Sequence, residues 1–247
     1  MRGKEIAHMD PKYTAKLIRK EEIATDTMAF YWEKPKGFTF KAGHYCDMTL
    51  NKPKVTDEDV KERALSLASA PYEERLMTAT RISDSAFKQW IEDFTVGTEV
   101  KFDEPRGEFT LHEDELIPAV FIIGGIGITP VRSIIAQATY DQLPHKLTLV
   151  YSNETPETAA FMSDLNGYAE KNTNFTFVPI MTDANPREWS GESDLIDETM
   201  VKKYVSDIQA PIYYLCGPPG MVKDLRNMLI EVGVENNNIR VEEFSGY

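Results

Sequence analysis

The clearest chemistry in the sequence lies in a glycine turn that follows an apolar run. Residues 120–123 are continuously apolar, as in a parallel strand that is buried on both faces. Glycines follow at 124, 125 and 127, and apolar residues at helical spacing then cover 131–135. We expect Thr129 to cap that helix and Pro130 to occupy its first position. A strand, a glycine turn and a helix start in this order form an anion site, because free N–H groups face a phosphate. A tight turn without a ligand is the alternative.

Two arginines in the first half of the chain are candidates for a second anion site. Arg63 opens the stretch 63–71, and its planar fork of donors matches a diphosphate. Ser66, three residues on, is placed to hydrogen-bond a ring nitrogen. The alternative for Arg63 is an edge-strand arginine paired with an acidic neighbour. Arg81 precedes Ser-Asp-Ser at 83–85, which is either another anion cradle at a helix start or ordinary capping.

Two segments near the C-terminus complete the set of candidates. Cys216-Gly-Pro-Pro follows the apolar run 212–215, which places a small polarizable side chain at the carboxyl edge of the predicted parallel sheet, where ligands bind. A buried, purely structural cysteine is the alternative. Residues 241–247 combine two carboxylates with aromatic side chains, and this tail either docks over a flat ring or frays.

The pattern of secondary structure changes near residue 115. Short strands separated by turn residues are predicted at 13–18, 27–32, 45–50, 63–71, 76–82 and 98–102, with one helix over 83–94. Such spacing predicts a small antiparallel barrel. Strands at 120–123, 147–151, 175–180, 212–215 and 239–244 then alternate with helices that start near 130, 156, 196 and 221. This alternation predicts a parallel sheet with crossover helices, and we expect two domains, 1–115 and 116–247.

Charge and composition restrict the partners, the location and the metal sites that we expect. The chain of 247 residues has a net charge of −13, which argues against nucleic acid or an anionic membrane as its partner. It shows neither a signal peptide nor an apolar run long enough to span a membrane, so we expect a cytoplasmic location. The two cysteines are far apart and lack metal-ligand spacing, so no metal site is expected. The N-terminal 54 residues are mildly basic, with 11 Lys or Arg against 7 Asp or Glu.

Together, these segments resemble the ferredoxin–NADP reductase superfamily. Arg63-Ala-Leu-Ser66 is similar to the family's Arg-x-Tyr/Phe-Ser flavin motif, and Gly124-Gly-Ile-Gly-Ile-Thr-Pro130 to its Gly-Gly-x-Gly-x-Thr-Pro motif. Cys216-Gly-Pro-Pro-Gly-Met221 resembles the Cys-Gly-Pro-x-x-Met nicotinamide motif, and the Glu-Glu-Phe near the end resembles the family's terminal carboxylate and aromatic residue. The resemblance extends from about residue 13 to 247 and implies an antiparallel Greek-key flavin-binding barrel followed by a Rossmann-like parallel-sheet nucleotide-binding domain.

The resemblance also implies which residues form the site. For FAD these are Arg63, Ala64, Leu65, Ser66, Thr80, Arg81, Ser85, Ala86 and Phe87, with Phe244 or Tyr247 covering the other face of the flavin. For the nicotinamide dinucleotide they are Gly125, Gly127, Ile128, Thr129, Pro130, Ser152, Cys216, Gly217, Pro218 and Met221. Ser66, Cys216 and Glu243 are the expected catalytic residues. The implied reaction is hydride transfer from NAD(P)H to bound FAD and electron transfer to a separate acceptor.

Three positions depart from the family pattern. Leu65 replaces the usual aromatic residue against the flavin, and Ser85-Ala86 replaces a glycine-rich phosphate turn, although FAD is still preferred over FMN. The third departure is Glu154, which follows the second strand of the nucleotide domain where an arginine pairs with a 2′-phosphate. Its charge repels that phosphate and favours NADH over NADPH.

The acceptor is expected to be separate, because no cysteine-rich ferredoxin domain is fused to these residues. It is either a redox protein, such as a ferredoxin or a flavodoxin, docking on the basic N-terminal zone (Lys34, Lys36, Lys41, Lys52 and Lys54), or a small molecule. Two alternatives stay open. One is a reductase of free flavin or quinone, and the other is a non-catalytic electron-relay subunit.

Overall fold

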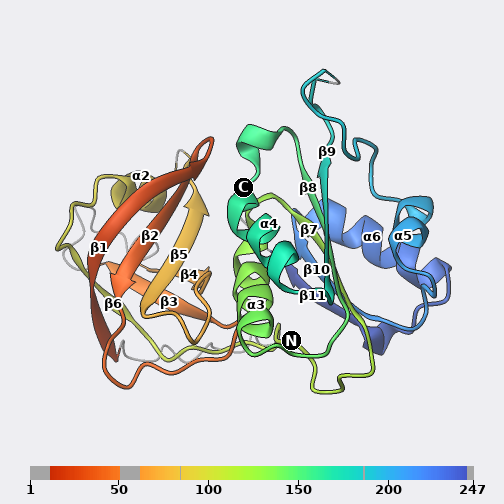
Figure 1. Ribbon diagram of the computed structural model, residues 1–247. Helices are drawn as coiled ribbons and strands as arrows, with labels where there is room; N and C mark the ends of the chain where they lie inside the picture. Colours follow the sequence, from red (N-terminus) through yellow and green to blue (C-terminus); the bar gives the residue numbers. More distant parts are fainter. Residues whose placement is uncertain (1–11, 51–61, 84, 186, 244–247) are drawn as a thin grey trace, which may run out of the picture.

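The N-terminal half of the chain folds into an antiparallel barrel. The computed structural model describes residues 12–50, 62–83, 85–185 and 187–243. A six-stranded sheet has the order β4-β3-β6-β1-β2-β5, and every neighbouring pair in it is antiparallel. Its strands are β1 (Tyr13–Ala24), β2 (Thr27–Glu33), β3 (Tyr45–Leu50), β4 (Glu62–Ser66), β5 (Arg75–Arg81) and β6 (Glu99–Phe102). This barrel lies to one side of the molecule in Figure 1.

The barrel is closed by backbone contacts and filled by aromatic side chains. An isolated bridge joins Leu67, just after β4, to Thr78 on β5, so the two edge strands meet. Trp32 is completely buried at the centre, and its indole Nε1 donates to Thr78 Oγ1 at 3.0 Å. Helix α2 (Ala86–Glu92) covers one end with Phe87 and Ile91, which are buried in the barrel core. The alternation of apolar residues along each strand supplies this interior.

The C-terminal half is a parallel sheet of five strands in the order β11-β10-β7-β8-β9. These are β7 (Ala119–Gly124), β8 (Leu147–Asn153), β9 (Phe175–Met181), β10 (Ile212–Gly217) and β11 (Ile239–Glu243). Every residue of β7 is buried, as its continuous apolar run predicts for a central strand. The connecting helices are α3 (Ile128–Tyr140), α4 (Met162–Lys171), α5 (Glu198–Tyr204) and α6 (Pro219–Glu231), with 3₁₀ turns at Gly125–Gly127, Pro156–Thr158 and Asn236–Asn238.

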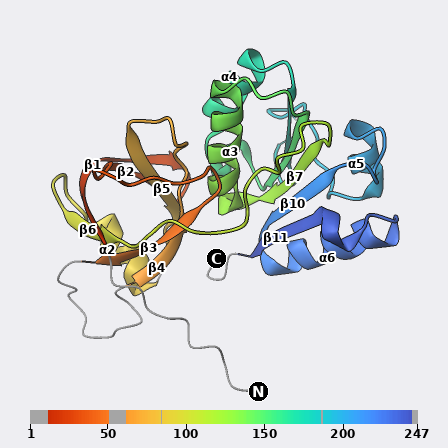
Figure 2. The ribbon, with the colours of Figure 1, turned by 90° about the horizontal axis from the view of Figure 1, so that it is seen from below.

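The helices form layers on both faces of this sheet. Helices α3 and α4 lie between the sheet and the barrel, and α5 and α6 cover the opposite face (Figures 1 and 2). One apolar cluster includes Phe121 of β7 and Ile134 of α3 together with Ala68 and Met77 of the barrel. The two halves therefore share a core across their boundary. Among the described residues, no helix combines the length and apolar character that a membrane crossing requires.

The predicted fold class is confirmed, and the differences are local. The helix expected over 156–168 is divided into the turn Pro156–Thr158 and α4, because Phe161 takes a left-handed conformation with φ of 62° that an α-helix cannot include. Barrel strands end at Phe102 and the parallel sheet begins at Ala119, so the predicted boundary at 115 lies in the connector 103–118. The part of the C-terminal prediction that covers Phe244 and Tyr247 lies outside the described residues.

The connector is held against the barrel at Gly43. This glycine has φ of +95°, and a Cβ built on it lies 2.0 Å from the backbone oxygen of Phe109. Any side chain there meets both a strained backbone and an overlap with the connector. Gly37 offers a matched comparison, because its φ is +82° but nothing lies within 4 Å of the corresponding Cβ.

We therefore predict that Gly43→Ala lowers the free energy of unfolding by about 3 kcal/mol or more, whereas Gly37→Ala costs about 1–2 kcal/mol from left-handed strain alone. Urea unfolding of both variants measures the difference. Equal losses would show that the connector yields freely around residue 43.

Candidate functional site

The candidate site lies at the carboxyl edge of the parallel sheet. Strands β7 and β10 are neighbours in the sheet, and the strand order reverses between them, since β8 and β9 lie on one side and β11 on the other. Such a switch point leaves a crevice beyond the strand ends, where open α/β sheets bind ligands. Gly124 and Gly217 end the two strands. Both nucleotide-domain motifs of the sequence thus meet at one place.

The glycine turn presses directly against the end of β10. A Cβ built on Gly127 lies 2.7 Å from the carbonyl oxygen of Cys216 and 3.0 Å from the backbone nitrogen of Gly217. A residue with a side chain cannot replace Gly127 unless the backbone moves. Met221 of α6 packs against the same turn, since its sulfur is 2.6 Å from a Cβ built on Gly124. Pro218 precedes α6 and is partly exposed.

The helix after the glycine turn begins earlier than predicted. Its cap position is Gly127, and Thr129 is not the cap, because the Thr129 hydroxyl donates back to the carbonyl of Ile126 at 3.1 Å. The physical reason is that Gly127 already has helical dihedral angles, with φ of −57° and ψ of −9°. Pro130 therefore takes the third helical position, where a backbone N–H is still not needed.

Accessibility divides the glycine turn into two parts. Gly127, Ile128, Thr129 and Pro130 are buried, whereas Gly125 and Ile126 are partly exposed. The surface open to a ligand is therefore the first half of the turn. Sequence reasoning omitted Ile126, although its place between two glycines of the motif was the available signal.

Ser66 ends the β4 strand of the barrel. Its side chain is buried, and among the described residues its Oγ has no hydrogen-bond partner. An unsatisfied buried hydroxyl costs free energy, so it fits a group that accepts or donates a hydrogen bond there. Its strand neighbour on β3 is Tyr45. Ala64 is exposed, and Leu65 is partly buried against the barrel core.

Positive charge gathers at the outer end of the same strand. The Arg63 guanidinium lies 5.7 Å from the ring centroid of Phe87 at the start of α2. Burial, followed by the charges of Arg81 and Arg63, lowers the pKa of Lys88. Arg63, Arg81 and Lys88 therefore share one neighbourhood, and their mutual repulsion is relieved when an anion binds. Sequence reasoning missed Lys88, which lies one position past the predicted Ser85–Phe87 start.

The remaining barrel predictions have clear positions. Ser85 caps α2, because its Oγ accepts from the backbone N–H of Lys88 at 3.3 Å, and Ala86 is exposed beside it. Thr80 is buried on β5. Arg81 also acts on the far side of the boundary, where its charge opposes the rise in the pKa of Tyr151 that burial causes. The carboxyl end of β5, where Arg81 lies, is therefore near the carboxyl half of β8, where Tyr151 lies.

The carboxyl end of β8 contributes a second set of unsatisfied groups. Ser152 pairs with Gly124 across the sheet and is partly exposed. Asn153 is buried, and both polar atoms of its amide lack partners among the described residues. Glu154 follows and is exposed. Polar groups without partners at the ligand-binding edge of a sheet mark a surface suited to a polar ligand.

A carboxylate, that of Glu242, lies beside Cys216. The strand register pairs Cys216 with Glu242 and Gly217 with Glu243. Cys216 is completely buried, and burial, together with the charge of Glu242, raises the pKa of its thiol well above the ordinary value. Glu242 is therefore the strand neighbour of Cys216, and the catalytic role expected for Glu243 stays a prediction. Phe244 and Tyr247 lie outside the described residues.

Glu242 faces a cavity between the two halves of the molecule. The cavity has a volume of about 530 Å³ and is lined by Tyr45 of the barrel, residues 107–109 of the connector, and Arg240, Val241 and Glu242 of β11. Burial raises the pKa of Glu242 from its ordinary value to about 7. Its Oε2 has no partner among the described residues. Tyr45 also pairs with Ser66 across the barrel sheet. The cavity therefore borders both the barrel part of the site and β11.

The connector wall of the cavity is fixed to β10. The backbone N–H of His112 donates to the hydroxyl of Tyr214 at 2.9 Å, and Arg240 donates to the carbonyl of Thr110 at 2.7 Å. Tyr214 lies two residues before Cys216 on the same strand. Burial lowers the pKa of His112, whose Nε2 lies 2.8 Å from the carbonyl of Ile117. The wall is thus anchored by a buried polar network.

Comparisons with known proteins agree with this arrangement. Residues 121–227 match the family described as Oxidoreductase NAD-binding domain. The chain is 30% identical over 206 residues to a subunit of the Na(+)-translocating NADH-quinone reductase of Idiomarina loihiensis, and the match covers 77% of this chain and 50% of that protein. The same subunit of the Haemophilus influenzae reductase is 31% identical over 204 residues, or 74% of this chain and 48% of that protein. The chain spans about half the length of these relatives.

Solved structures share the fold over nearly the whole chain. The FAD/NAD-binding domain of nitric oxide dioxygenase from Vibrio cholerae has a TM-score of 0.82 at 18% identity and covers 96% of this chain and 100% of its own. A ferredoxin NADP+ reductase from Neisseria gonorrhoeae, solved with bound FAD and NADP, has a TM-score of 0.78 at 24% identity, with coverages of 94% and 98%. Residues 121–227 thus match an oxidoreductase NAD-binding domain, and the chain as a whole shares the two-domain fold of these FAD- and NAD(P)-binding structures.

Proposed function

We propose that the chain is an NADH-dependent reductase that holds FAD on the barrel and passes electrons from NADH to a separate acceptor. The observation that most strongly supports this proposal is the Ser66 hydroxyl, which is buried and has no hydrogen-bond partner among the described residues. Ser66 pairs across the barrel sheet with Tyr45, and Tyr45 lines the cavity together with Glu242. A bound flavin supplies the hydride-accepting chemistry that no side chain of the protein can perform.

The residues present fit that cofactor. Arg63, Arg81 and Lys88 form the positive neighbourhood that a pyrophosphate requires, beside the capped start of α2. Ser66 supplies a hydroxyl for a ring nitrogen, and Leu65 an apolar contact in place of an aromatic one. The cavity that Tyr45 and Glu242 line offers space for the rings between the two domains.

The nucleotide domain accounts for the donor. Gly125 and Ile126 leave backbone exposed at the start of α3, where N–H groups and the helix dipole favour a diphosphate. Cys216 and Gly217 end the neighbouring strand, where they would hold the nicotinamide ring. Preference for NADH is supported by Glu154, which is exposed after β8, and by the word NADH in the relatives' name.

The basic zone suggested by the sequence is weakened at Lys34, whose ammonium donates to the carbonyl of Pro71 at 2.7 Å and is partly buried. Lys52 and Lys54 lie outside the described residues. The relatives are named as subunits of a quinone reductase, and this favours either a quinone or a redox centre of a partner subunit as the acceptor. In that case the chain acts as the NADH-oxidising subunit of a larger assembly.

The visible spectrum tests the central proposal. We expect the purified chain, or the chain after addition of FAD and gel filtration, to show flavin absorbance that bleaches on anaerobic addition of NADH, and more slowly with NADPH. A chain that stays colourless after incubation with FAD would refute the flavoenzyme proposal. Flavin that bleaches but is lost on gel filtration would support the free-flavin reductase, and bound flavin that NADH does not bleach would support the relay.

Glu154→Arg tests the choice of nucleotide. Replacing a negative charge by a positive one removes the repulsion of a 2′-phosphate, so the ratio of kcat/KM for NADPH to that for NADH rises about tenfold or more. Glu157→Arg is the control, because Glu157 is also exposed and lies in the next turn, Pro156–Thr158. An equal change in both variants would mean a general charge effect and not a position beside the ribose.

Glu242→Gln tests the environment of the buried carboxyl. Because the folded pKa of about 7 is above the ordinary value, the protonated form stabilises the native state at low pH, and this contribution is lost as pH rises toward 7. The wild-type apoprotein therefore loses about 3 kcal/mol of stability between pH 4.5 and 7 from this group, and Glu242→Gln removes that slope. Urea unfolding across this range measures it, with the exposed Glu231→Gln as control. A slope unchanged in Glu242→Gln would show that the carboxyl is solvated.

A further inference from the structure

Helix α3 connects the two halves of the proposed site. It begins immediately after the glycine turn, and ten of its residues are buried. Its barrel-facing side contacts the segment 68–73, which starts two residues after Ser66. One rigid helix therefore touches both the nucleotide-binding turn and the chain that continues from the proposed flavin hydroxyl.

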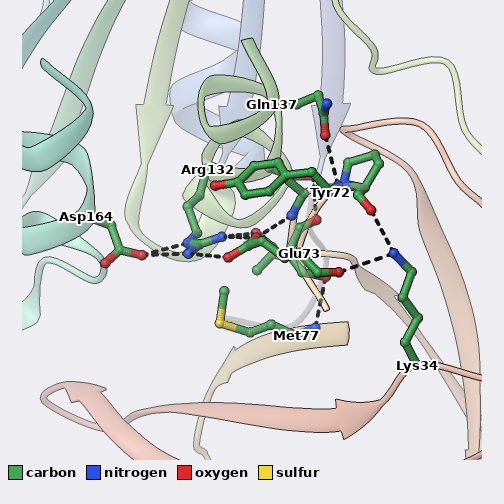
Figure 3. Close-up of polar contacts among 12 residues, drawn as sticks. Lys34, Tyr72, Glu73, Met77, Arg132, Gln137 and Asp164 are labelled. Atoms are coloured by element: carbon green, nitrogen blue, oxygen red, sulfur yellow. Dashed lines mark hydrogen bonds and ion pairs between the residues drawn. The ribbon is translucent and has the colours of Figure 1, made fainter. Parts of the chain in front are cut away.

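Arg132 makes the most extensive of these contacts. A guanidinium has five N–H donors, and Arg132 makes four hydrogen bonds and one further ion-pair contact with its own. Nη1 donates to the carbonyl of Ala68 at 2.9 Å and to Glu73 Oε2 at 2.8 Å, and Nη2 donates to Glu73 Oε1 at 3.1 Å. Nε and Nη2 reach Asp164 Oδ2 at 2.8 Å and 2.7 Å. Figure 3 shows the guanidinium between the two carboxylates.

The two carboxylates belong to different domains. Glu73 lies in the barrel turn before β5, whereas Asp164 lies on α4 of the same domain as Arg132. The Arg132 side chain is only 7% exposed, so its charge depends on both partners and not on water. The contact to Glu73 is bidentate and fixes direction as well as distance.

The other contacts between α3 and the same turn are single contacts, which restrict the relative orientation less than the bidentate Arg132–Glu73 pair does. The hydroxyl of Ser133 donates to the carbonyl of Ser69 at 2.7 Å, and Gln137 Oε1 accepts from the backbone N–H of Tyr72 at 3.2 Å. The rings of Tyr72 and Tyr140 stack at 4.1 Å between centroids. These contacts hold the surfaces together, but only Arg132 contacts the Ala68 carbonyl closest to Ser66.

We propose that Arg132, through Glu73 and the Ala68 carbonyl, is a positioning residue that sets the distance between the nicotinamide site on α3 and the flavin site after β4. This inference rests on the proposed function. In hydride transfer the C–H bond at nicotinamide C4 breaks and an N–H bond forms at flavin N5, which oxidises NADH and reduces the flavin by the two electrons carried. Misplacement by about 1 Å can cost about 100-fold in such a step.

Two conservative variants separate positioning from mere burial of the charge. Glu73→Gln removes the barrel carboxylate, and Asp164→Asn removes the carboxylate on the nucleotide domain's own α4. Each variant keeps the shape of the side chain and leaves Arg132 with one carboxylate. A positioning role predicts that only Glu73→Gln affects the relation between domains, whereas a purely structural role predicts similar effects of both. Arg132→Lys, which keeps the charge but loses the fork, should follow Glu73→Gln.

The first readout needs no cofactor. Both native cysteines are completely buried, so spin labels can be attached to Lys101→Cys on β6 and Lys223→Cys on α6, where the native side chains are exposed. We expect the distribution of distances between the labels in the apoprotein to broaden in Glu73→Gln and Arg132→Lys, and to match that of the otherwise unmutated labelled protein in Asp164→Asn. A distribution unchanged in all three, or broadened equally in all three, would overturn the inference.

The second readout is the rate of flavin reduction by NADH under anaerobic stopped flow. Glu73→Gln and Arg132→Lys should lower the limiting rate about 10- to 100-fold, with the Kd for NADH and the FAD content unchanged. Asp164→Asn should stay within about twofold of wild type. A wild-type chain that is not reduced by NADH refutes the proposed function, whatever the label distances. Reduction of wild type and Glu73→Gln at equal rates refutes the positioning role alone.

Discussion

The buried guanidinium of Arg132 needs anionic partners, and it finds them in carboxylates of both domains. This contact joins the barrel to the parallel sheet. Arg132 is nearly inaccessible to water, and removing a partner from such a cation costs several kcal/mol. The barrel meets the demand with a short turn in which the N–H of Glu73 donates to the carbonyl of Ala70 at 3.0 Å, so the carboxylate is held by local backbone. The apolar core that both domains share then packs around a contact with fixed direction.

Electrostatics inside the site differ from those of the whole chain. The net charge is −13, yet Arg63, Arg81 and Lys88 gather at one end of the barrel. Local potential and not net charge governs the binding of a small anion, because the groups lie within a Debye length of the ligand. At the other end of the site, Cys216 is buried and Glu242 is partly buried, and burial disfavours a charge on both. Arg63, Arg81 and Lys88 would hold the phosphates of the proposed flavin.

Much of the fold could be predicted from the sequence, because local patterns determine it. The strand over 45–50 was predicted with the bounds observed, and the apolar run of β7 identified the central strand. Errors occurred where geometry beyond the local pattern decides. The helix cap was assigned to Thr129, because composition cannot show that Gly127 is already helical. The division of the helix at Phe161 depends on a left-handed residue that has no glycine or asparagine signal.

The site residues that sequence reasoning missed depend on contacts between distant segments. Lys88 joins the cationic group only because α2 packs across the end of β4 and β5, and no spacing in the sequence shows that packing. Arg132 lies among apolar residues in a predicted buried helix. The local sequence pattern therefore does not distinguish an arginine that bridges two domains from one whose charged end reaches water.

Glu242 illustrates the same limit at the scale of one residue. Composition alone does not show which of two successive glutamates is the neighbour of Cys216 on the adjacent strand. Only the register of β11 against β10 shows it, and that register pairs Cys216 with Glu242. Arg240, two residues earlier, lines the same cavity and lies 5.3 Å from the ring centroid of Tyr214, two residues before Cys216. The pairs Tyr214–Arg240 and Cys216–Glu242 are thus successive steps on one face of the sheet, and this is why a carboxyl whose burial disfavours its charge lies where the proposed reaction takes place.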